Sequence, residues 1–178
     1  IAVYGTIKHI LHPKALILCS PLFGLLTPMP LVAARLLAKV LATTPLGNLA
    51  TGTGADRRAA FKGNPLTQSK ERFAAMVNGP YKTPTPTFAW IQATFNAIAV
   101  ISNKKYLKGL KIPVSIVVGE KESVVDRRVY GTWISRWQKQ TGLKAKFKII
   151  PGAQHELLNE ADRYRNKAIT FINQAIKK

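Results

Sequence analysis

The side chains best suited to acid–base chemistry gather in two short stretches in the second half of the chain. Glu120, Glu122 and Asp126 fall within seven residues, although the whole chain has only eight acidic residues. His155 is one of only three histidines, and it lies in a glycine-containing loop. An imidazole can act as a general base near neutral pH when a carboxylate holds its other ring nitrogen in the required tautomer. The two stretches therefore predict an acid–histidine pair, if the fold brings them together.

Among the three acids, Glu122 is our candidate for the partner of His155. Asp126 is also well placed to cap the helix that follows, and Glu120 lies very close to the end of a predicted strand. The alternative for all three is a solvated acidic loop, and the alternative for His155 is a loop histidine without a role. The other two histidines, His9 and His12, are expected to be surface or capping residues.

Two strand-like runs precede these stretches. Residues 114–118 form a β-branched apolar run between Pro113 and Gly119, which is typical of a buried parallel strand. Residues 145–150 alternate, with Lys144, Lys146 and Lys148 on one face, and this pattern indicates an edge strand protected by lysines. Functional residues in open α/β sheets lie at the carboxyl ends of the strands, so both stretches are expected at the same edge.

The rest of the chain supports an α/β fold. We expect a strand over residues 14–20 and helices over residues 1–10, 31–41, 70–78, 88–102, 127–140 and after Glu160, with residues 56–61 forming a helical turn and 103–111 basic and exposed. Without residues 21–87, the order is β-α-β-α-β-α, which predicts a parallel sheet with right-handed crossovers. We therefore expect helix and strand of the core in 1–20, a helical cap or lid in 21–87, and the remaining core in 88–178.

A nucleophile is missing from this arrangement. The chain contains no Gly-x-Ser-x-Gly elbow, and Ser20 is the only serine at the end of a predicted strand. The order Ser20, Glu122, His155 would suit a serine hydrolase, but the residues around Ser20 lack the small side chains that a nucleophile elbow needs. We expect Ser20 to pack or hydrogen-bond instead. No zinc-ligand spacing, phosphate loop or dinucleotide fingerprint occurs, so neither a metal nor a cofactor is expected.

The charge is the most unusual global property. The 178 residues carry 27 Lys and Arg and a net charge of +19. Because the cations are scattered and no nucleic-acid-binding motif accompanies them, we favour attraction to an anionic membrane surface, with a merely solvated surface as an equal alternative. The single cysteine, Cys19, is expected in the core and fits a reducing compartment. The expected location is cytoplasmic, with peripheral attachment to the inner membrane as an alternative.

Five segments together resemble the α/β-hydrolase superfamily, in its lysophospholipase and monoacylglycerol-lipase-like branch. They read ALILCSPLFG (15–24), GNPLTQSKERF (63–73), PTFAWIQATF (86–95), VVGEKESVVD (117–126) and PGAQHELLNE (151–160). The resemblance implies that Glu122 and His155 are the catalytic acid and histidine, and that residues 21–87 are the cap. It also implies that the serine elbow precedes Ile1, so that this chain is the C-terminal portion of the enzyme and inactive without its N-terminal half.

The resemblance implies a serine carboxylic-ester hydrolase that acts on a lysophospholipid or a monoacylglycerol. Apolar residues of the cap region would then receive the acyl chain: Phe23, Leu26, Met29 and Trp90 above all, with Leu22, Leu25, Phe61 and Phe73 beside them. The alternative is a non-catalytic basic remnant or module that binds anionic membrane or nucleic acid.

Overall fold

The computed structural model describes residues 1–51, 60–80 and 85–177 of the chain. Within them, β1 (Leu16–Cys19), β2 (Val114–Gly119) and β3 (Lys146–Ile150) form a sheet in the order β1-β2-β3. Both pairings are parallel, with Leu18 opposite Ile116 and Val117 opposite Lys148. The parallel α/β arrangement predicted from the sequence is thereby confirmed, although β1 and β3 are shorter than the predicted strands.

Burial follows the position of each strand in the sheet. All six residues of β2 are buried, as expected for a central strand covered on both faces. In β3, three central residues are exposed and only Ile150 is buried, so the predicted edge strand with its lysines is confirmed.

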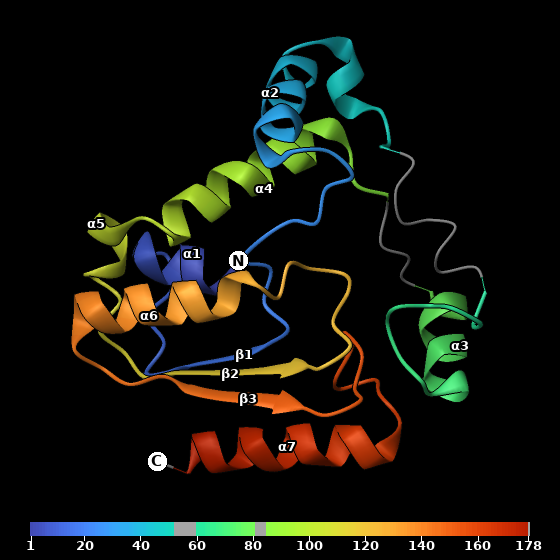
Figure 1. Cartoon of the computed structure of the whole chain (residues 1–178), viewed down its shortest axis with the longest axis vertical. Helices are drawn as coiled ribbons and strands as arrows, with labels where there is room; N and C mark the ends of the chain where they lie inside the picture. Colours follow the sequence, from blue (N-terminus) through green and yellow to red (C-terminus); the bar gives the residue numbers. More distant parts are fainter. Residues whose placement is uncertain (52–59, 81–84, 178) are drawn as a thin grey trace.

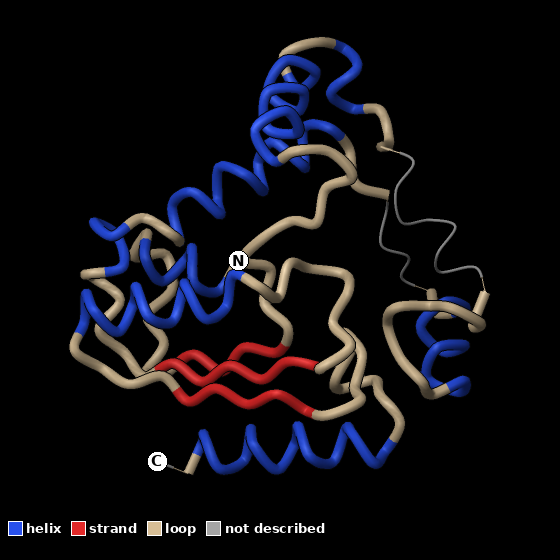
Figure 2. Tube along the Cα trace, in the orientation of Figure 1, coloured by secondary structure: helices blue, strands red, loops and turns tan. Residues whose placement is uncertain are grey.

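Helices cover both faces of this sheet. Figure 1 shows α1 (Ala2–Ile7) and α6 (Val129–Thr141) on one face and α7 (Asp162–Ile176) on the other. Figure 2 shows the same three layers, with the loops after β2 and β3 meeting at one end of the sheet. Both strand pairs are parallel, so this end is the carboxyl end of all three strands. The chain thus places the two stretches of interest at the carboxyl edge of the sheet.

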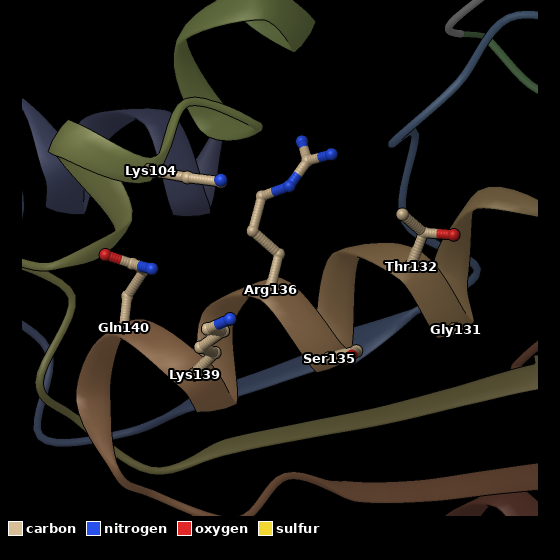
Figure 3. A pocket seen from close by; sticks show the side chains of 7 residues that line it. All are labelled: Lys104, Gly131, Thr132, Ser135, Arg136, Lys139 and Gln140. Carbon is tan, nitrogen blue, oxygen red and sulfur yellow. The ribbon is translucent and has the colours of Figure 1, made fainter.

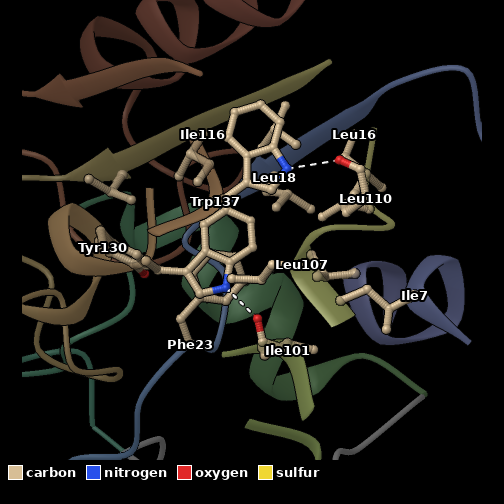
Figure 4. Close-up of a cluster of buried hydrophobic side chains, with 14 of the residues drawn as sticks. Ile7, Leu16, Leu18, Phe23, Ile101, Leu107, Leu110, Ile116, Tyr130 and Trp137 are labelled. Carbon is tan, nitrogen blue, oxygen red and sulfur yellow. Dashed lines mark hydrogen bonds between the residues drawn. The ribbon is translucent and has the colours of Figure 1, made fainter. Parts of the chain in front are cut away.

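The larger core lies between the sheet and α6. Trp137 is fully buried, and its indole N–H donates to the carbonyl of Leu110 over 2.9 Å; Trp133 donates to Ile101 over 2.8 Å (Figure 4). Leu107, the last residue of α5 (Lys104–Leu107), and Leu110 are buried here as well. The prediction that residues 103–111 are basic and exposed therefore holds for the lysines and is wrong for Leu107 and Leu110, which pack into this core.

Most helix boundaries lie within one residue of the predicted ones, with two exceptions. α1 ends at Ile7 instead of residue 10, and α6 begins at Val129 instead of residue 127, because Asp126 accepts the main-chain N–H of Arg128 in a turn before the helix. Two of the predicted N-caps are confirmed: Ser69 accepts from the N–H of Arg72, and Thr87 from that of Trp90. The third, Asp126, is not the N-cap, because Arg128 takes that position in α6. Gly142 ends α6 in the left-handed conformation, also as predicted.

The predicted cap region contains α2 (Leu31–Ala42), the 3₁₀ helix η1 (Pro45–Asn48) and α3 (Lys70–Asn78). In Figure 1, α2 packs on the N-terminal end of α4 (Phe88–Ile101), and α3 lies beside the carboxyl edge of the sheet. Most of the helical turn predicted over residues 56–61 lies outside the described residues. The division of the chain into core (1–20), cap (21–87) and remaining core (88–178) stays a prediction. None of the described helices has the length and apolarity needed to cross a membrane.

Candidate active site

Glu122 and His155 form a direct pair at the carboxyl edge of the sheet. Nδ1 of His155 lies 2.7 Å from Oε2 of Glu122, across the ends of the neighbouring strands β2 and β3. The Glu122 side chain is 0% exposed and that of His155 is 18% exposed. The structure thus brings together the two residues singled out from the sequence and leaves part of the imidazole accessible.

Glu122 is held as an ionised carboxylate. Its second oxygen, Oε1, accepts main-chain N–H groups from Val124 (2.8 Å) and Val125 (3.2 Å). Burial by itself raises the pKa of Glu122, but the hydrogen bond and charge of His155, together with these two N–H groups, lower that pKa below its usual value. When the imidazole is neutral, Nδ1 of His155 carries its proton, because an ionised carboxylate only accepts hydrogen bonds, and Nε2 then has the free lone pair. This is the tautomer that a general base needs.

Gly119, the last residue of β2, allows the loop after β3, which carries His155, to pack closely against the end of β2, which leads to Glu122. A Cβ atom on Gly119 would lie 2.3 Å from the carbonyl oxygen of Gln154 and 2.4 Å from that of Ala153. The main-chain N–H of Lys121 donates to the same Ala153 carbonyl over 2.8 Å. The backbone before His155 is therefore packed directly on the strand end that leads to Glu122, and only glycine leaves room for it.

The other two acids have different partners. Oε2 of Glu120 accepts the main-chain N–H of Gly152 over 2.8 Å and so fixes the start of the loop that carries His155. Asp126 pairs with Arg128 over 2.8 Å, and the hydrogen bond from this guanidinium lowers the pKa of Asp126. Geometry thus selects Glu122 from the three candidates that the sequence left open.

Ser20 lies beside the pair but is directed at the backbone. Its hydroxyl donates to the carbonyl oxygen of His155 over 2.9 Å, and its main-chain N–H donates to Val117. Its φ of 41° is in the left-handed region, which a non-glycine residue adopts only where surrounding contacts enforce it. Ser20 therefore ties the end of β1 to the histidine loop, the hydrogen-bonding role expected from its sequence context.

The four predicted acyl-chain residues are not equivalent. Phe23 is buried, with its ring centroid 4.4 Å from that of Trp133, so its side chain packs in the core, and its role in an acyl-chain pocket stays a prediction. Leu26, Met29 and Trp90 are 47%, 39% and 46% exposed, and these large apolar side chains are available for contact with a ligand.

Sequence reasoning missed two residues of the site. Gly119 was interpreted only as the end of a strand, and Glu160 only as the acidic start of the last helix. Glu160 is fully buried, and its carboxylate accepts the main-chain N–H of Gln154, the residue before His155, over 2.8 Å. A signal for Gly119 exists in the sequence, since a glycine at the end of a central strand often marks a close backbone approach. Glu160 gave no such signal.

A surface cleft between α5 and α6 is separate from this pair (Figure 3). It is lined by Lys104, Gly131, Thr132, Ser135, Arg136, Lys139 and Gln140, and so by three cations without an acid. Neither Glu122 nor His155 lines it, so it is not the acid–base site. In the described part of the chain, no three His, Cys, Asp or Glu side chains are grouped so that they could hold a metal ion.

Comparison with known proteins gives a consistent result. The family model described as "Serine aminopeptidase, S33", a family of α/β-hydrolases, matches residues 1–162. A probable lysophospholipase L2 of Haemophilus influenzae is 28% identical over 180 residues, covering 97% of this chain and 55% of the relative. The lysophospholipase L2 of Escherichia coli K12 is 27% identical over 179 residues, covering 90% and 50%. The chain thus spans about half the length of these curated relatives.

Solved structures share the fold. A monoacylglycerol lipase of Paleococcus ferrophilus superposes with a TM-score of 0.72 at 16% identity, over 99% of this chain and 63% of the lipase. A soluble variant of the monoglyceride lipase of Saccharomyces cerevisiae gives a TM-score of 0.71 at 20% identity, over 97% and 59%. At these identities the likeness concerns the fold alone.

Replacement of Gly119 by alanine should destabilise the protein. The added methyl group would clash with two backbone oxygens, which cannot move aside as a flexible side chain can. We expect the free energy of unfolding, measured by urea denaturation, to fall by about 1–3 kcal/mol. Gly131→Ala is the matched control, since nothing lies within 4 Å of its Cβ position in α6 and alanine favours a helix. Equal stability of Gly119→Ala and the parent would contradict the close approach.

The lowered pKa of Glu122 predicts a pH-dependent contribution to stability. A carboxylate whose pKa is lower in the folded than in the unfolded protein stabilises the fold fully above its unfolded pKa, near 4.5. That contribution is lost as the pH falls from there through the lowered folded-state pKa. The difference in unfolding free energy between the parent and Glu122→Gln should therefore be constant near about pH 6 and shrink towards about pH 3. A difference that grows on acidification would contradict the ionised pair.

Proposed function

This chain belongs to the S33 serine aminopeptidase family of α/β-hydrolases, and we propose that it is the C-terminal portion of a serine carboxylic-ester hydrolase that supplies the catalytic acid and histidine. The hydrogen bond of 2.7 Å between Glu122 and His155 carries this proposal. The buried carboxylate fixes the proton on Nδ1, and the partly exposed imidazole presents Nε2 as the base.

The geometry supports a definite role for each residue. His155 would take the proton of a serine hydroxyl as that serine attacks the ester carbonyl, and would then return it to the leaving alcohol. Glu122 would stabilise the imidazolium formed between these two transfers. No Gly-x-Ser-x-Gly occurs in the 178 residues, so the nucleophile would come from another part of the hydrolase. The chain alone is expected to be inactive, because acid and base have no serine to activate.

Lysophospholipids and monoacylglycerols are the substrate classes that we propose. Relatives in sequence are named lysophospholipases, and relatives in fold are named monoacylglycerol or monoglyceride lipases. The exposed apolar side chains of Leu26, Met29 and Trp90 would contact the acyl chain in a helical cap over residues 21–87. Phe23 and Phe73 are buried and pack elsewhere, Phe23 against Trp133 and Phe73 against Phe61.

Loss of either proposed catalytic residue should abolish ester hydrolysis in the protein that carries this chain with its serine-bearing portion. In a serine hydrolase, removal of the acid lowers kcat by about 10⁴-fold, and removal of the histidine base lowers it by about 10⁶-fold. We expect losses of these orders for Glu122→Gln and His155→Ala, respectively, measured with short-chain and long-chain monoacylglycerol esters.

Matched variants separate this role from general damage. His12→Ala removes an exposed histidine, and Glu120→Gln and Asp126→Asn test the two competing acids. His12→Ala should retain the parent kcat, and the two acid variants should retain far more activity than Glu122→Gln. Unchanged hydrolysis by a folded His155→Ala protein would exclude the proposed assignment.

A second candidate function is supported by the basic cleft between α5 and α6. Lys104, Arg136 and Lys139 meet there without an acidic lining residue, in a chain of net charge +19. Binding of an anionic membrane surface would relieve their mutual repulsion, at about 1 kcal/mol for each cation near the surface. In this second function, the chain would be a non-catalytic basic module. If the chain is part of a hydrolase instead, the same cations would attach a cytoplasmic enzyme peripherally to the membrane.

Vesicle sedimentation tests this second function. The protein should bind phosphatidylglycerol vesicles more tightly than phosphatidylcholine vesicles, with an affinity that falls steeply with salt concentration. Combined Lys104→Glu and Lys139→Glu substitutions should weaken binding by at least roughly 30-fold, because the loss of two cations at about 1 kcal/mol each already accounts for that factor and the new carboxylates are repelled. Lys148→Glu with Lys167→Glu changes the net charge equally on β3 and α7 and should have a smaller effect. Equal losses in both double variants would mean that the cleft is not the docking surface.

A further inference from the structure

Glu160 is a fully buried carboxylate surrounded by N–H donors. Oε1 accepts the main-chain N–H of Gln154 (2.8 Å) and the side-chain amide of Gln68 (3.2 Å). Oε2 accepts the main-chain N–H groups of Gln68 (2.9 Å) and Ala161 (2.8 Å). Among the described residues, no Lys, Arg or His side chain forms an ion pair with this carboxylate. Four N–H dipoles thus replace the water that an ionised carboxylate loses on burial.

Three of these four donors come from two segments that are far apart in the sequence, and the fourth is the N–H of Ala161, the next residue in the chain. Residues 64–68 belong to the predicted cap, and residues 152–156 form the loop that carries His155. The segments are also joined directly: Gln154 Nε2 donates to Asn64 O (3.0 Å), the N–H of Glu156 to Leu66 O (2.8 Å), and Gln68 Nε2 to Gly152 O (2.7 Å). In Figure 1 this loop lies next to the connection that leads into α3. The histidine loop is therefore attached to the cap region on one side and to β2 on the other.

A carboxylate suits this position better than a neutral amide. An ionised carboxylate accepts at both oxygens, whereas glutamine would direct an NH₂ group at N–H donors that need an acceptor. A buried N–H group without an acceptor costs about 1–3 kcal/mol. The loop could avoid that cost only by moving, and Gln154 is covalently attached to His155.

We propose that Glu160 is a positioning residue that keeps His155 within hydrogen-bonding distance of Glu122. It does so by accepting N–H groups from both Gln154 and Gln68, which joins the histidine loop to residues 64–68. The inference rests on the proposed hydrolase function and extends it. Glu160 does not touch the imidazole or any reacting atom, and it acts through the loop. Misplacement of a catalytic group by about 1 Å can cost about 10²-fold in rate, so a loop displaced by this amount would show in kcat.

The test is Glu160→Gln in the full hydrolase that contains this chain. We expect kcat to fall about 10- to 100-fold with little change in KM, because Glu160 is buried and makes no substrate surface. A second measurement is the proton NMR signal of His155 Nδ1–H, which a short hydrogen bond to a carboxylate moves strongly downfield. This signal should shift or broaden in Glu160→Gln and stay in place in the control Glu71→Gln, an exposed glutamate at the start of α3.

Gln68→Ala provides an independent variant if Glu160→Gln does not fold. It removes the side-chain donor to Glu160 and Gly152 but leaves the carboxylate and its other donors in place. We expect the same direction of change in kcat and in the Nδ1–H signal, with a smaller size. A folded Glu160→Gln or, failing that, Gln68→Ala protein with the parent kcat and an unaltered Nδ1–H signal would overturn the inference.

The two proposals fail in different ways. If His155→Ala hydrolyses ester as well as the parent, the proposed function is wrong, whereas the Nδ1–H signal still decides whether Glu160 positions the imidazole. If His155→Ala is inactive but Glu160→Gln matches the parent in both measurements, only the positioning role is wrong.

Discussion

The constraint on which this site depends is that the Glu122 carboxylate must remain ionised without water. A buried carboxylate costs several kcal/mol unless hydrogen-bond donors replace its hydration. Two of these donors, the N–H groups of Val124 and Val125, come from its own loop, and the third is the imidazole of His155. The orientation of the imidazole is therefore a direct consequence of solvating the acid, and the same contact joins the ends of two neighbouring strands.

That contact requires the backbones to approach more closely than side chains normally allow. Parallel pairing of β2 with β3 brings their carboxyl ends to one edge, but pairing alone leaves the following loops free to diverge. Gly119 lets the backbone of Ala153 and Gln154 pack on the end of β2, and Glu120 accepts an N–H from the same loop. The pairing of β2 with β3 therefore brings Glu122 and His155 to the same edge of the sheet, and these backbone contacts bring the two side chains within hydrogen-bonding distance.

The sequence predicted the parts of this arrangement that depend on local pattern. The apolar run before Gly119 identified the central strand, and the position of Glu122 and His155 after neighbouring strands indicated that they would meet. Burial of Leu107 could not be predicted from a segment rich in lysine, because the neighbouring charges dominate its local pattern. The role of Glu160 could not be predicted either. Its N–H donors include Gln68, which is distant in the sequence and comes close only in the tertiary structure.

The acid–base pair is preorganised by contacts that lie entirely within this chain. Ser20 holds the carbonyl of His155, Gly119 admits its loop, and Glu160 binds the residue before it. None of these contacts depends on a substrate or on a serine nucleophile. If a serine is brought within reach of Nε2, the imidazole therefore needs no reorganisation to accept its proton, and catalysis in polar sites depends largely on avoiding that reorganisation. Under the proposed function, the two tasks would be separate: this chain would orient the base, and the serine-bearing part of the hydrolase would only have to present the hydroxyl to it.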